Sequence, residues 1–181
     1  MANAPFHGAM QQDHTPIRAV FFDRDGVLIV DTGYPSKPDE IHWIDGAQRA
    51  LIRLAALGYR RFVVTNQSGV ARGYFDEGAV QSIHAAMQAA LPDAARIDDF
   101  AYCPHHPGGS VARYATACDC RKPAPGMLNS LIARHRIDRA GSFLIGDRAS
   151  DLAAAAAAGI DGFLFPGGDL DRFVVQLLRG A

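Results

Sequence analysis

The sequence predicts an α/β fold in which a central parallel sheet is covered by helices on both faces. From Ile17 onward, short apolar runs alternate with blocks that have the periodicity of amphipathic helices. This alternation is typical of three-layer, Rossmann-like folds, in which each helix crosses over one face of the sheet. The 181 residues suit a single hydrophobic core. We therefore expect one domain over residues 16–181, preceded by a flexible polar tail at residues 1–15.

Five apolar runs have the length and composition of buried strands. The first reads Ala-Val-Phe-Phe and ends at Asp23, and the second ends in Val-Val-Thr. Continuous apolar runs of this kind are typical of parallel strands that are buried on both faces. In chain order, the expected strands are residues 19–22, 61–65, 100–103, 142–146 and 162–165.

Blocks of helical periodicity separate these strands, and several of them have recognisable ends. Gly58 closes the first block and Gly159 stops the alanine-rich one, because glycine readily adopts the left-handed conformation found after helices. Asp76 is a plausible N-terminal cap for the second block, which ends before Pro92. The expected helices are residues 45–57, 76–91, 127–135, 153–158 and 173–178, with an irregular segment at 104–125.

The composition excludes several classes of function. The net charge is −1, and 20% of the residues are charged, so the sequence has no basic surface that would favour nucleic acid or an anionic membrane. No apolar run approaches the roughly 18 residues that a membrane helix needs. Residues 1–15 lack the features of a secretory signal. We expect a cytoplasmic protein that binds neither nucleic acid nor membrane.

Polar side chains follow the strands at the points where the strands end. Asp23, Thr65, Cys103 and Asp147 each lie at or directly after the last residue of an expected strand. In open parallel sheets, ligands bind outside the carboxyl ends of the strands. The sequence therefore predicts that these four side chains lie around one site.

Asp23 and Asp25 form a pair of carboxylates that is suited to phosphoryl transfer. Residues two apart in an extended segment point the same way, and Gly26 permits a sharp turn after them. An aspartate is ionised at neutral pH and attacks without an activating base, while a second carboxyl group can protonate the leaving oxygen. The alternative is a pair of loop aspartates that caps a turn.

Three further segments carry groups that would support this chemistry. Thr65 supplies a hydroxyl group, Lys122 a compact positive charge beside Arg121, and Asp147 with Asp151 a second carboxylate pair that suits magnesium. Each has a plain alternative: a turn cap, a solvated pair of cations, and a helix cap before the alanine run.

The order acid, hydroxyl, lysine, acid along the chain resembles the haloacid dehalogenase (HAD) phosphatase superfamily. The resemblance implies that Asp23 is the nucleophile and Asp25 the general acid and base, and that Thr65 and Lys122 stabilise the transferring phosphoryl group. It also implies that Mg²⁺ is held by Asp23, by the backbone carbonyl of Asp25 and by Asp147.

The first motif departs from the superfamily pattern at one position, and the spacing of the motifs limits what covers the site. Val27 stands where the superfamily often has threonine. The intervals from Asp23 to Thr65 and from Thr65 to Lys122 leave no room for an inserted cap domain. We therefore expect an open site that takes a small, highly charged substrate and needs no partner subunit, so the protein is expected to be a monomer.

Three cysteines and two histidines cluster within the irregular segment, at residues 103–120. Cys103 is followed by His105 and His106, and Cys118 and Cys120 come after a loop. Three thiolates and one imidazole are the donor set of a closed tetrahedral zinc site, which would brace the loop and perform no chemistry. The alternative is a set of buried thiols with incidental histidines.

Along residues 17–165 the chain resembles more closely the D-glycero-D-manno-heptose-1,7-bisphosphate 7-phosphatase family, which serves ADP-heptose and lipopolysaccharide biosynthesis. The resemblance rests on Asp-Arg-Asp-Gly at 23–26, Asp-Thr-Gly-Tyr at 31–34, Thr-Asn-Gln-Ser-Gly-Val-Ala-Arg-Gly at 65–73, Cys-Pro-His-His-Pro at 103–107, and Cys-Asp-Cys-Arg-Lys-Pro at 118–123.

This family resemblance implies a sugar bisphosphate as substrate and assigns further residues. Zn²⁺ would be held by Cys103, His105, Cys118 and Cys120. Arg121 would bind the second phosphate, and Arg148 stands where the family often has lysine. The implied substrate contacts are Asp31, Thr32, Gly33, Tyr34, Thr65, Asn66, Gln67, Ser68, Arg121, Lys122 and Arg148.

Two other functions are compatible with parts of the sequence. Histidinol-phosphate phosphatases share the catalytic set and the zinc ligands, and the Gly-Asp-Arg-Ala-Ser-Asp segment at 146–151 leans toward them. Their zinc loop is typically shorter than the one here. The third possibility, a zinc-bearing interaction module without activity, conflicts with the presence of every catalytic residue type.

Overall fold

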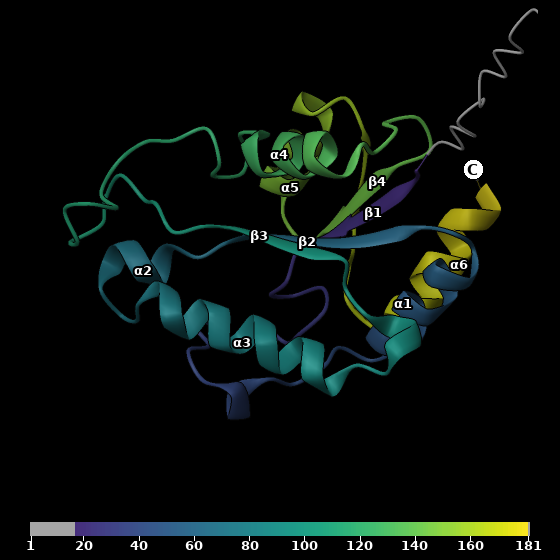
Figure 1. The fold of residues 1–181 in the computed structure, drawn as a ribbon, viewed down its shortest axis with the longest axis horizontal. Helices are drawn as coiled ribbons and strands as arrows, with labels where there is room; N and C mark the ends of the chain where they lie inside the picture. The colour runs from purple at the N-terminus through teal and green to yellow at the C-terminus, as the bar shows by residue number, and fades with distance from the viewer. Residues whose placement is uncertain (1–16, 181) are drawn as a thin grey trace, which may run out of the picture.

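The computed structural model describes residues 17–180, and the expected tail at 1–15 lies outside them. Five parallel strands form one sheet in the order β3-β2-β1-β4-β5 (Figure 1). The strands are β1 (Ala19–Phe22), β2 (Arg60–Asn66), β3 (Asp99–Cys103), β4 (Phe143–Gly146) and β5 (Asp161–Leu164). The predicted fold class, a parallel sheet flanked by helices, is confirmed.

Helices cover both faces of the sheet (Figure 1). One face packs against α1, α3 and α6, and the other against α4 and α5. The α-helices are α1 (Ala47–Ala56), α2 (Ser68–Arg72), α3 (Glu77–Ala90), α4 (Gly126–His135), α5 (Ala149–Ala157) and α6 (Leu170–Gly180), and the 3₁₀ helices are η1 (Pro38–Glu40) and η2 (Asp93–Ala95).

The central strand β1 explains why the sheet needs both helical layers. Val20 and Phe22 pack in the core beneath α1 and α6, whereas Ala19 and Phe21 pack beneath α4 and α5. All four are fully buried. Burying a Val or Phe side chain stabilises a fold by roughly 1.5–3 kcal/mol. The strand is therefore anchored from both sides, which fixes the position of the residues that follow it.

The element boundaries differ from expectation mainly at helix starts. Helix α5 begins at Ala149, ahead of the predicted alanine run, because the side chain of Asp151 accepts a hydrogen bond from the backbone N–H of Arg148 at 3.0 Å and caps the helix. The short helix α2 was not predicted. Between β1 and β2 the chain holds only η1 and α1, so these described residues contain no cap domain.

The strand order places the chain's change of direction beside β1. The chain runs outward from β1 through β2 to β3, then returns to add β4 on the other side of β1. Ligands bind at such switch points, outside the carboxyl ends of the strands.

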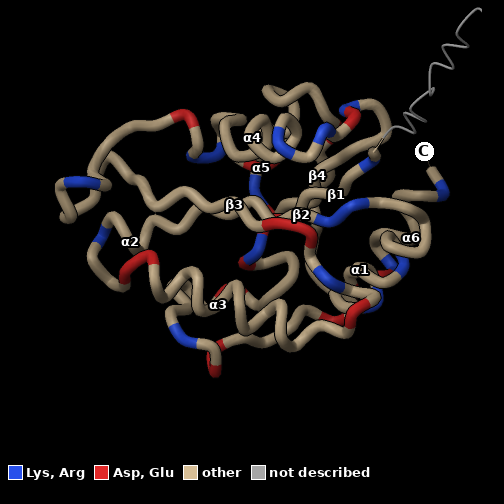
Figure 2. The backbone as a smooth tube through the Cα atoms, viewed as in Figure 1, with Lys and Arg blue, Asp and Glu red and all other residues tan. Residues whose placement is uncertain are grey.

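Lys and Arg residues are interspersed with Asp and Glu around the molecule (Figure 2). Among residues 17–180, no helix is long and apolar enough to cross a membrane.

Candidate active site and zinc centre

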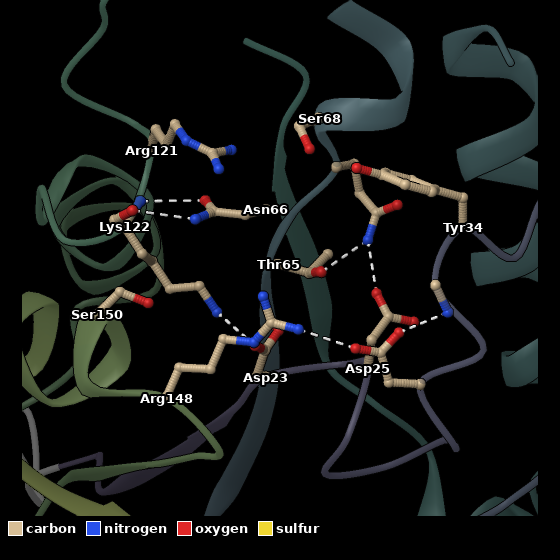
Figure 3. A pocket seen from close by; sticks show the side chains of 13 residues that line it. Asp23, Asp25, Tyr34, Thr65, Asn66, Ser68, Arg121, Lys122, Arg148 and Ser150 are labelled. Carbon is tan, nitrogen blue, oxygen red and sulfur yellow. Dashed lines mark hydrogen bonds and ion pairs between the residues drawn. The ribbon is translucent and has the colours of Figure 1, made fainter. Parts of the chain in front are cut away.

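A pocket of about 390 Å³ opens at the carboxyl ends of the strands (Figure 3). Every predicted catalytic residue lines it, and so does every predicted substrate contact except Thr32. The lining residues are Asp23, Asp25, Asp31, Gly33, Tyr34, Thr65, Asn66, Gln67, Ser68, Arg121, Lys122, Arg148 and Ser150. Ser150, in the first turn of α5, is the one lining residue that the sequence analysis did not single out.

Asp23 is held at the end of β1 by backbone contacts. Its N–H donates to the carbonyl of Ile145 in β4 at 3.0 Å, and its Oδ1 accepts from the N–H of Arg24 at 2.7 Å. The residue is 8% exposed. Burial raises the pKa of Asp23 to about 6, against the lowering effect of the Lys122 charge. The carboxylate is therefore ionised at neutral pH but poorly solvated, as suits a nucleophile.

Lys122 reaches Asp23 from the loop that precedes α4. Its Nζ lies 3.0 Å from Asp23 Oδ2 (Figure 3). The same Nζ lies 2.6 Å from Asp151 Oδ1 and donates to the carbonyl of Val64 at 2.9 Å. Burial lowers the pKa of Lys122, but the two carboxylates outweigh burial and leave that pKa above its ordinary value. The ammonium group is thus a fixed positive charge beside the Asp23 carboxylate.

The backbone of Lys122 is clamped by the side chain of Asn66. The Asn66 amide donates to the Lys122 carbonyl and accepts from its N–H, both at 3.0 Å. Asn66 is the last residue of β2. Asn66 lines the pocket, and its amide oxygen and one of its two amide N–H groups hold the lysine in place.

Asp25 lies on the other side of Asp23, and both of its oxygens accept hydrogen bonds. Arg24 donates to Oδ1 through Nε at 3.1 Å and to Oδ2 through Nη2 at 2.9 Å. Gln67 donates from Nε2 to Asp25 Oδ2 at 2.8 Å and to Thr65 Oγ1 at 2.9 Å. Because Thr65 accepts this bond, its own hydroxyl proton is left to donate into the pocket.

Three carboxylates meet where a hard cation would bind. Oxygens of Asp23, Asp147 and Asp151 all lie within 4.8 Å of one another. Asp147 Oδ1 is buried without a hydrogen-bond partner in the described chain, and burial raises the pKa of Asp147. A divalent cation with oxygen ligands would satisfy that atom. The residues present therefore fit Mg²⁺.

Gly26 allows this cluster to form. Its φ is +82°, and a Cβ atom there would lie 2.5 Å from Asp147 Oδ2. Only glycine satisfies both the left-handed backbone and the close approach of the carboxylate.

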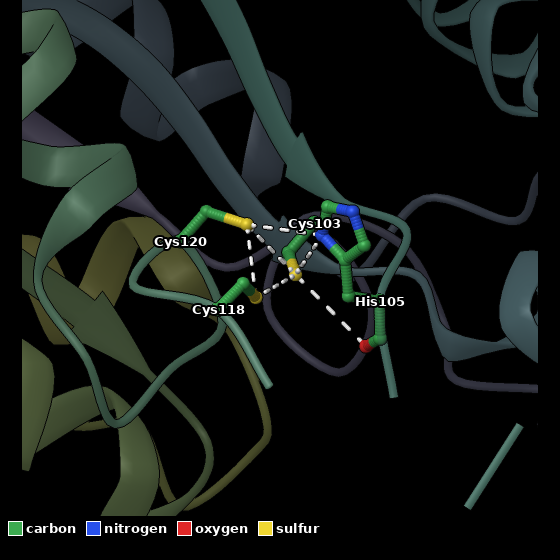
Figure 4. Close-up of side chains that lie close together, drawn as sticks. All are labelled: Cys103, His105, Cys118 and Cys120. Atoms are coloured by element: carbon green, nitrogen blue, oxygen red, sulfur yellow. Dashed lines mark hydrogen bonds between the residues drawn. The ribbon is translucent and has the colours of Figure 1, made fainter. Parts of the chain in front are cut away.

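The predicted zinc ligands come together in the loop between β3 and α4 (Figure 4). The sulfurs of Cys103, Cys118 and Cys120 lie 3.1 to 3.5 Å apart, and His105 Nδ1 lies 3.4 Å from Cys120 Sγ. In a tetrahedral site with Zn–S bonds of roughly 2.3 Å, the sulfurs lie about 3.8 Å apart, which is slightly more than the distances found here. His106 is turned away, its Nδ1 accepting from Gly108 N–H.

The chemistry of this donor set fits Zn²⁺. All three cysteines are free, and burial raises the pKa of Cys103 and of Cys120. Crowded thiols in such surroundings lose their protons when a metal neutralises them. The cluster is therefore consistent with a structural zinc site.

The zinc loop is docked on the elements that carry the pocket. Val111 N–H donates to the carbonyl of Ala71 in α2 at 2.9 Å, and the Glu77 carboxylate in α3 accepts hydrogen bonds from Tyr114 of the loop and Tyr102 of β3. Order in the loop is thus tied to α2, which begins at the pocket.

Several known proteins are similar in sequence to this chain over most of its length. A family model described as HAD-hydrolase-like matches residues 119–175. The D-glycero-β-D-manno-heptose-1,7-bisphosphate 7-phosphatase of Rhodopseudomonas palustris is 47% identical over 161 residues, which cover 88% of this chain and 89% of that protein. The phosphatase of the same name from Salmonella typhi is 45% identical over 145 residues, 80% of this chain and 77% of its own. The chain belongs to this heptose-bisphosphate phosphatase family.

Solved structures agree with the family assignment. The D,D-heptose 1,7-bisphosphate phosphatase from B. bronchiseptica, complexed with magnesium and phosphate, is similar at a TM-score of 0.79 and 33% identity, covering 91% of this chain and 100% of that one. The corresponding Burkholderia thailandensis enzyme gives 0.56 and 31%, covering 89% and 98%. The predicted HAD fold and family resemblance are confirmed.

The rim of the pocket in this heptose phosphatase carries two long arginine side chains. Arg148 Nη2 pairs with Asp31 Oδ2 at 2.9 Å, and the Arg148 side chain is 64% exposed. Arg121 Nη1 donates to the carbonyl of His105 at 3.3 Å. The zinc loop therefore holds one rim arginine, and the other bridges α5 and the segment after β1.

Sequence reasoning missed the ionic roles of two buried residues. Arg24 was not singled out, because arginine is rarely fully buried. Side chains alternate in direction along a strand, and this alternation would have pointed Arg24 away from the face that carries the two carboxylates. Asp151 was considered as a magnesium ligand or helix cap. It caps α5 and also pairs with Lys122, a contact that no spacing could reveal.

Proposed function

We propose that this protein hydrolyses the 7-phosphate of D-glycero-β-D-manno-heptose 1,7-bisphosphate, releasing phosphate and the heptose 1-phosphate, in ADP-heptose biosynthesis. The observation that carries the proposal is that Asp23, Asp25 and Lys122 line one pocket, with Asp147 close to Asp23, in a chain of this family. The β configuration follows the names of the curated relatives.

The reaction would proceed in two transfers at Asp23. In the first, a carboxylate oxygen of Asp23 bonds to phosphorus, the bond from phosphorus to the sugar oxygen breaks, and Asp25 gives that oxygen a proton. In the second, Asp25 takes a proton from water, which attacks the phosphorus of the aspartyl phosphate and releases phosphate. Asp23 returns to its ionised form.

The surrounding cations and donors would hold the transferring group. Lys122 already lies 3.0 Å from Asp23 and would neutralise charge that develops on the phosphoryl oxygens, while the Thr65 hydroxyl donates to one of them. Asp23 and Asp147, with the backbone carbonyl of Asp25, would hold Mg²⁺. The chemistry supplied by magnesium bound there is Lewis-acid neutralisation of phosphoryl charge.

The second phosphate would be bound at the rim. Arg121 presents a planar guanidinium group that suits a phosphate, and the His105 carbonyl orients it. Asp31, Thr32, Gly33, Tyr34, Asn66, Gln67, Ser68 and Arg148 complete the proposed substrate contacts. Zn²⁺ held by Cys103, His105, Cys118 and Cys120 would keep the loop ordered. One chain supplies the whole pocket, so we also propose a monomer. We further propose that the protein acts in the cytoplasm, because its curated relatives are enzymes of heptose biosynthesis.

Kinetics on three substrates test the proposal. With Mg²⁺, kcat/KM should be highest for the β anomer of the heptose bisphosphate, lower for the α anomer and lowest for histidinol phosphate. Asp23→Asn should abolish phosphate release. A preference for histidinol phosphate would overturn the substrate, and activity that survives in the Asp23→Asn protein would overturn the mechanism.

A further inference from the structure

Beneath the proposed general acid lies an arginine that the reaction scheme does not use. Arg24 is fully buried, although it stands between the two catalytic aspartates in the sequence. Its carbonyl accepts hydrogen bonds from the N–H groups of Leu28 and Ile29, both at 3.0 Å. The turn therefore fixes the backbone from which the Arg24 side chain starts, and its guanidinium group has little freedom to move.

Asp25 is the carboxylate with which this buried cation pairs. Within residues 17–180, the only ion pair that Arg24 makes is with Asp25, through two parallel contacts at 2.9 and 3.1 Å. The nearby His84 does not compete, because burial and the Arg24 charge lower the pKa of His84 to about 3 and keep it neutral. Bidentate contacts of this kind orient a carboxylate as well as attract it.

The contacts of Asp25 leave one place for a proton. A carboxylate has about four lone-pair sites, two on each oxygen. Oδ2 accepts from Arg24 Nη2 and from Gln67 Nε2, so both of its sites are used. Oδ1 accepts only from Arg24 Nε among the described residues, so one of its sites is free. Asp25 lines the pocket, where a substrate oxygen would approach.

We infer that Arg24 and Gln67 are positioning residues that aim the free lone pair of Asp25 Oδ1 at the leaving oxygen, so that Oδ1 is the atom that gives and later takes the proton. The inference rests on the proposed role of Asp25 as general acid and base. It does not depend on which sugar phosphate is the substrate.

Leaving groups that differ in their need for a proton test this inference. p-Nitrophenolate leaves without protonation, whereas phenolate and alkoxides need the acid, and kcat/KM reports the step in which the leaving group departs. In Arg24→Lys, which keeps the charge but loses the fork, kcat/KM for phenyl phosphate should fall by about 100-fold and for p-nitrophenyl phosphate by less than about tenfold. Gln67→Met should show the same selectivity with a smaller loss.

A double-mutant cycle separates positioning from a structural role. If Arg24 acts through Asp25, the Arg24→Lys change should cost nothing further in an Asp25→Asn background, measured with the heptose bisphosphate. Additive losses would overturn the inference, and so would equal losses for both aryl phosphates. If Arg24→Lys does not fold, the ratio of the two aryl phosphate rates in Gln67→Met decides, because Gln67 also donates to Thr65 Oγ1 and its loss would not vanish in the Asp25→Asn background.

A matched control addresses destabilisation. Leu51→Ala removes a fully buried side chain of α1, away from the pocket, and should therefore destabilise the fold. It should leave the ratio of the two aryl phosphate rates unchanged. A ratio that shifts in Leu51→Ala as much as in Arg24→Lys would show that destabilisation alone causes the effect. Inactivity of the wild-type protein on every phosphate ester would instead refute the proposed function.

Discussion

Replacing the proposed nucleophile should stabilise the metal-free protein. The structure buries Asp23 and raises its pKa from an ordinary 3.8 to about 6. Between these two values the folded state holds a proton that the unfolded state has lost. The free energy of unfolding therefore falls as pH rises through this window, and the full cost is present above about pH 6.

The size of the effect follows from the same shift. A shift of about two pKa units corresponds to roughly 3 kcal/mol at pH 7.5, because one unit is worth about 1.4 kcal/mol. Asp23→Asn removes this cost, and Lys122 keeps Asp151 at 2.6 Å as its partner. For a chain of this length, roughly 3 kcal/mol raises Tm by about 6–12 °C.

Thermal and denaturant unfolding at several pH values, in magnesium-free buffer, measure this difference. We expect Asp23→Asn to exceed wild type at pH 7.5 and to converge with it near pH 4. Exposed Asp39→Asn, as control, should change stability by less than about 0.5 kcal/mol. Asp151→Asn should destabilise, since it breaks the buried pair with Lys122. An Asp23→Asn protein that is less stable at pH 7.5, or whose gain persists at pH 4, would refute the reasoning.

Three further changes should have distinct results. Gly26→Ala should lose most phosphatase activity and bind Mg²⁺ weakly in calorimetry, because its Cβ would meet Asp147 at 2.5 Å; full activity would contradict this close approach. His105→Ala should lose bound zinc by elemental analysis while His106→Ala keeps it, since His105, and not His106, lies with the three thiols; equal zinc contents would contradict the ligand assignment. Chelating zinc should raise KM for the heptose bisphosphate more than it lowers kcat, because the loop carbonyl of His105 holds Arg121; an unchanged KM would separate the loop from substrate binding.

Much of the site could be located from sequence because of how parallel sheets are built. Strand β1 is apolar on both faces and ends just before Asp23, and β4 ends just before Asp147, so the two carboxylates had to meet at one edge of the sheet. The cysteines and His105 could be grouped by spacing and by family resemblance. These inferences needed only element order and residue type.

Side-chain partners were beyond such reasoning, since they depend on how separate layers pack. Asn66 lines the pocket as predicted, yet its amide is used to hold the Lys122 backbone. Thr32 lies in a segment with three pocket residues but does not line the pocket itself. Helix α2 has only five residues, too few to show helical periodicity in the sequence, and it was therefore not predicted.

The sequence by itself determined which chemical groups this protein brings to its active site: two acids after the first strand, a hydroxyl group after the second, a lysine behind the zinc ligands and an acid after the fourth strand. The tertiary structure decided what each group is free to do. Arg24 binds both oxygens of Asp25, and Asp151 shares Lys122 with Asp23. Strand order is written in local patterns along the chain, whereas the contacts that leave one oxygen of Asp25 open arise only when distant segments pack together and exclude water.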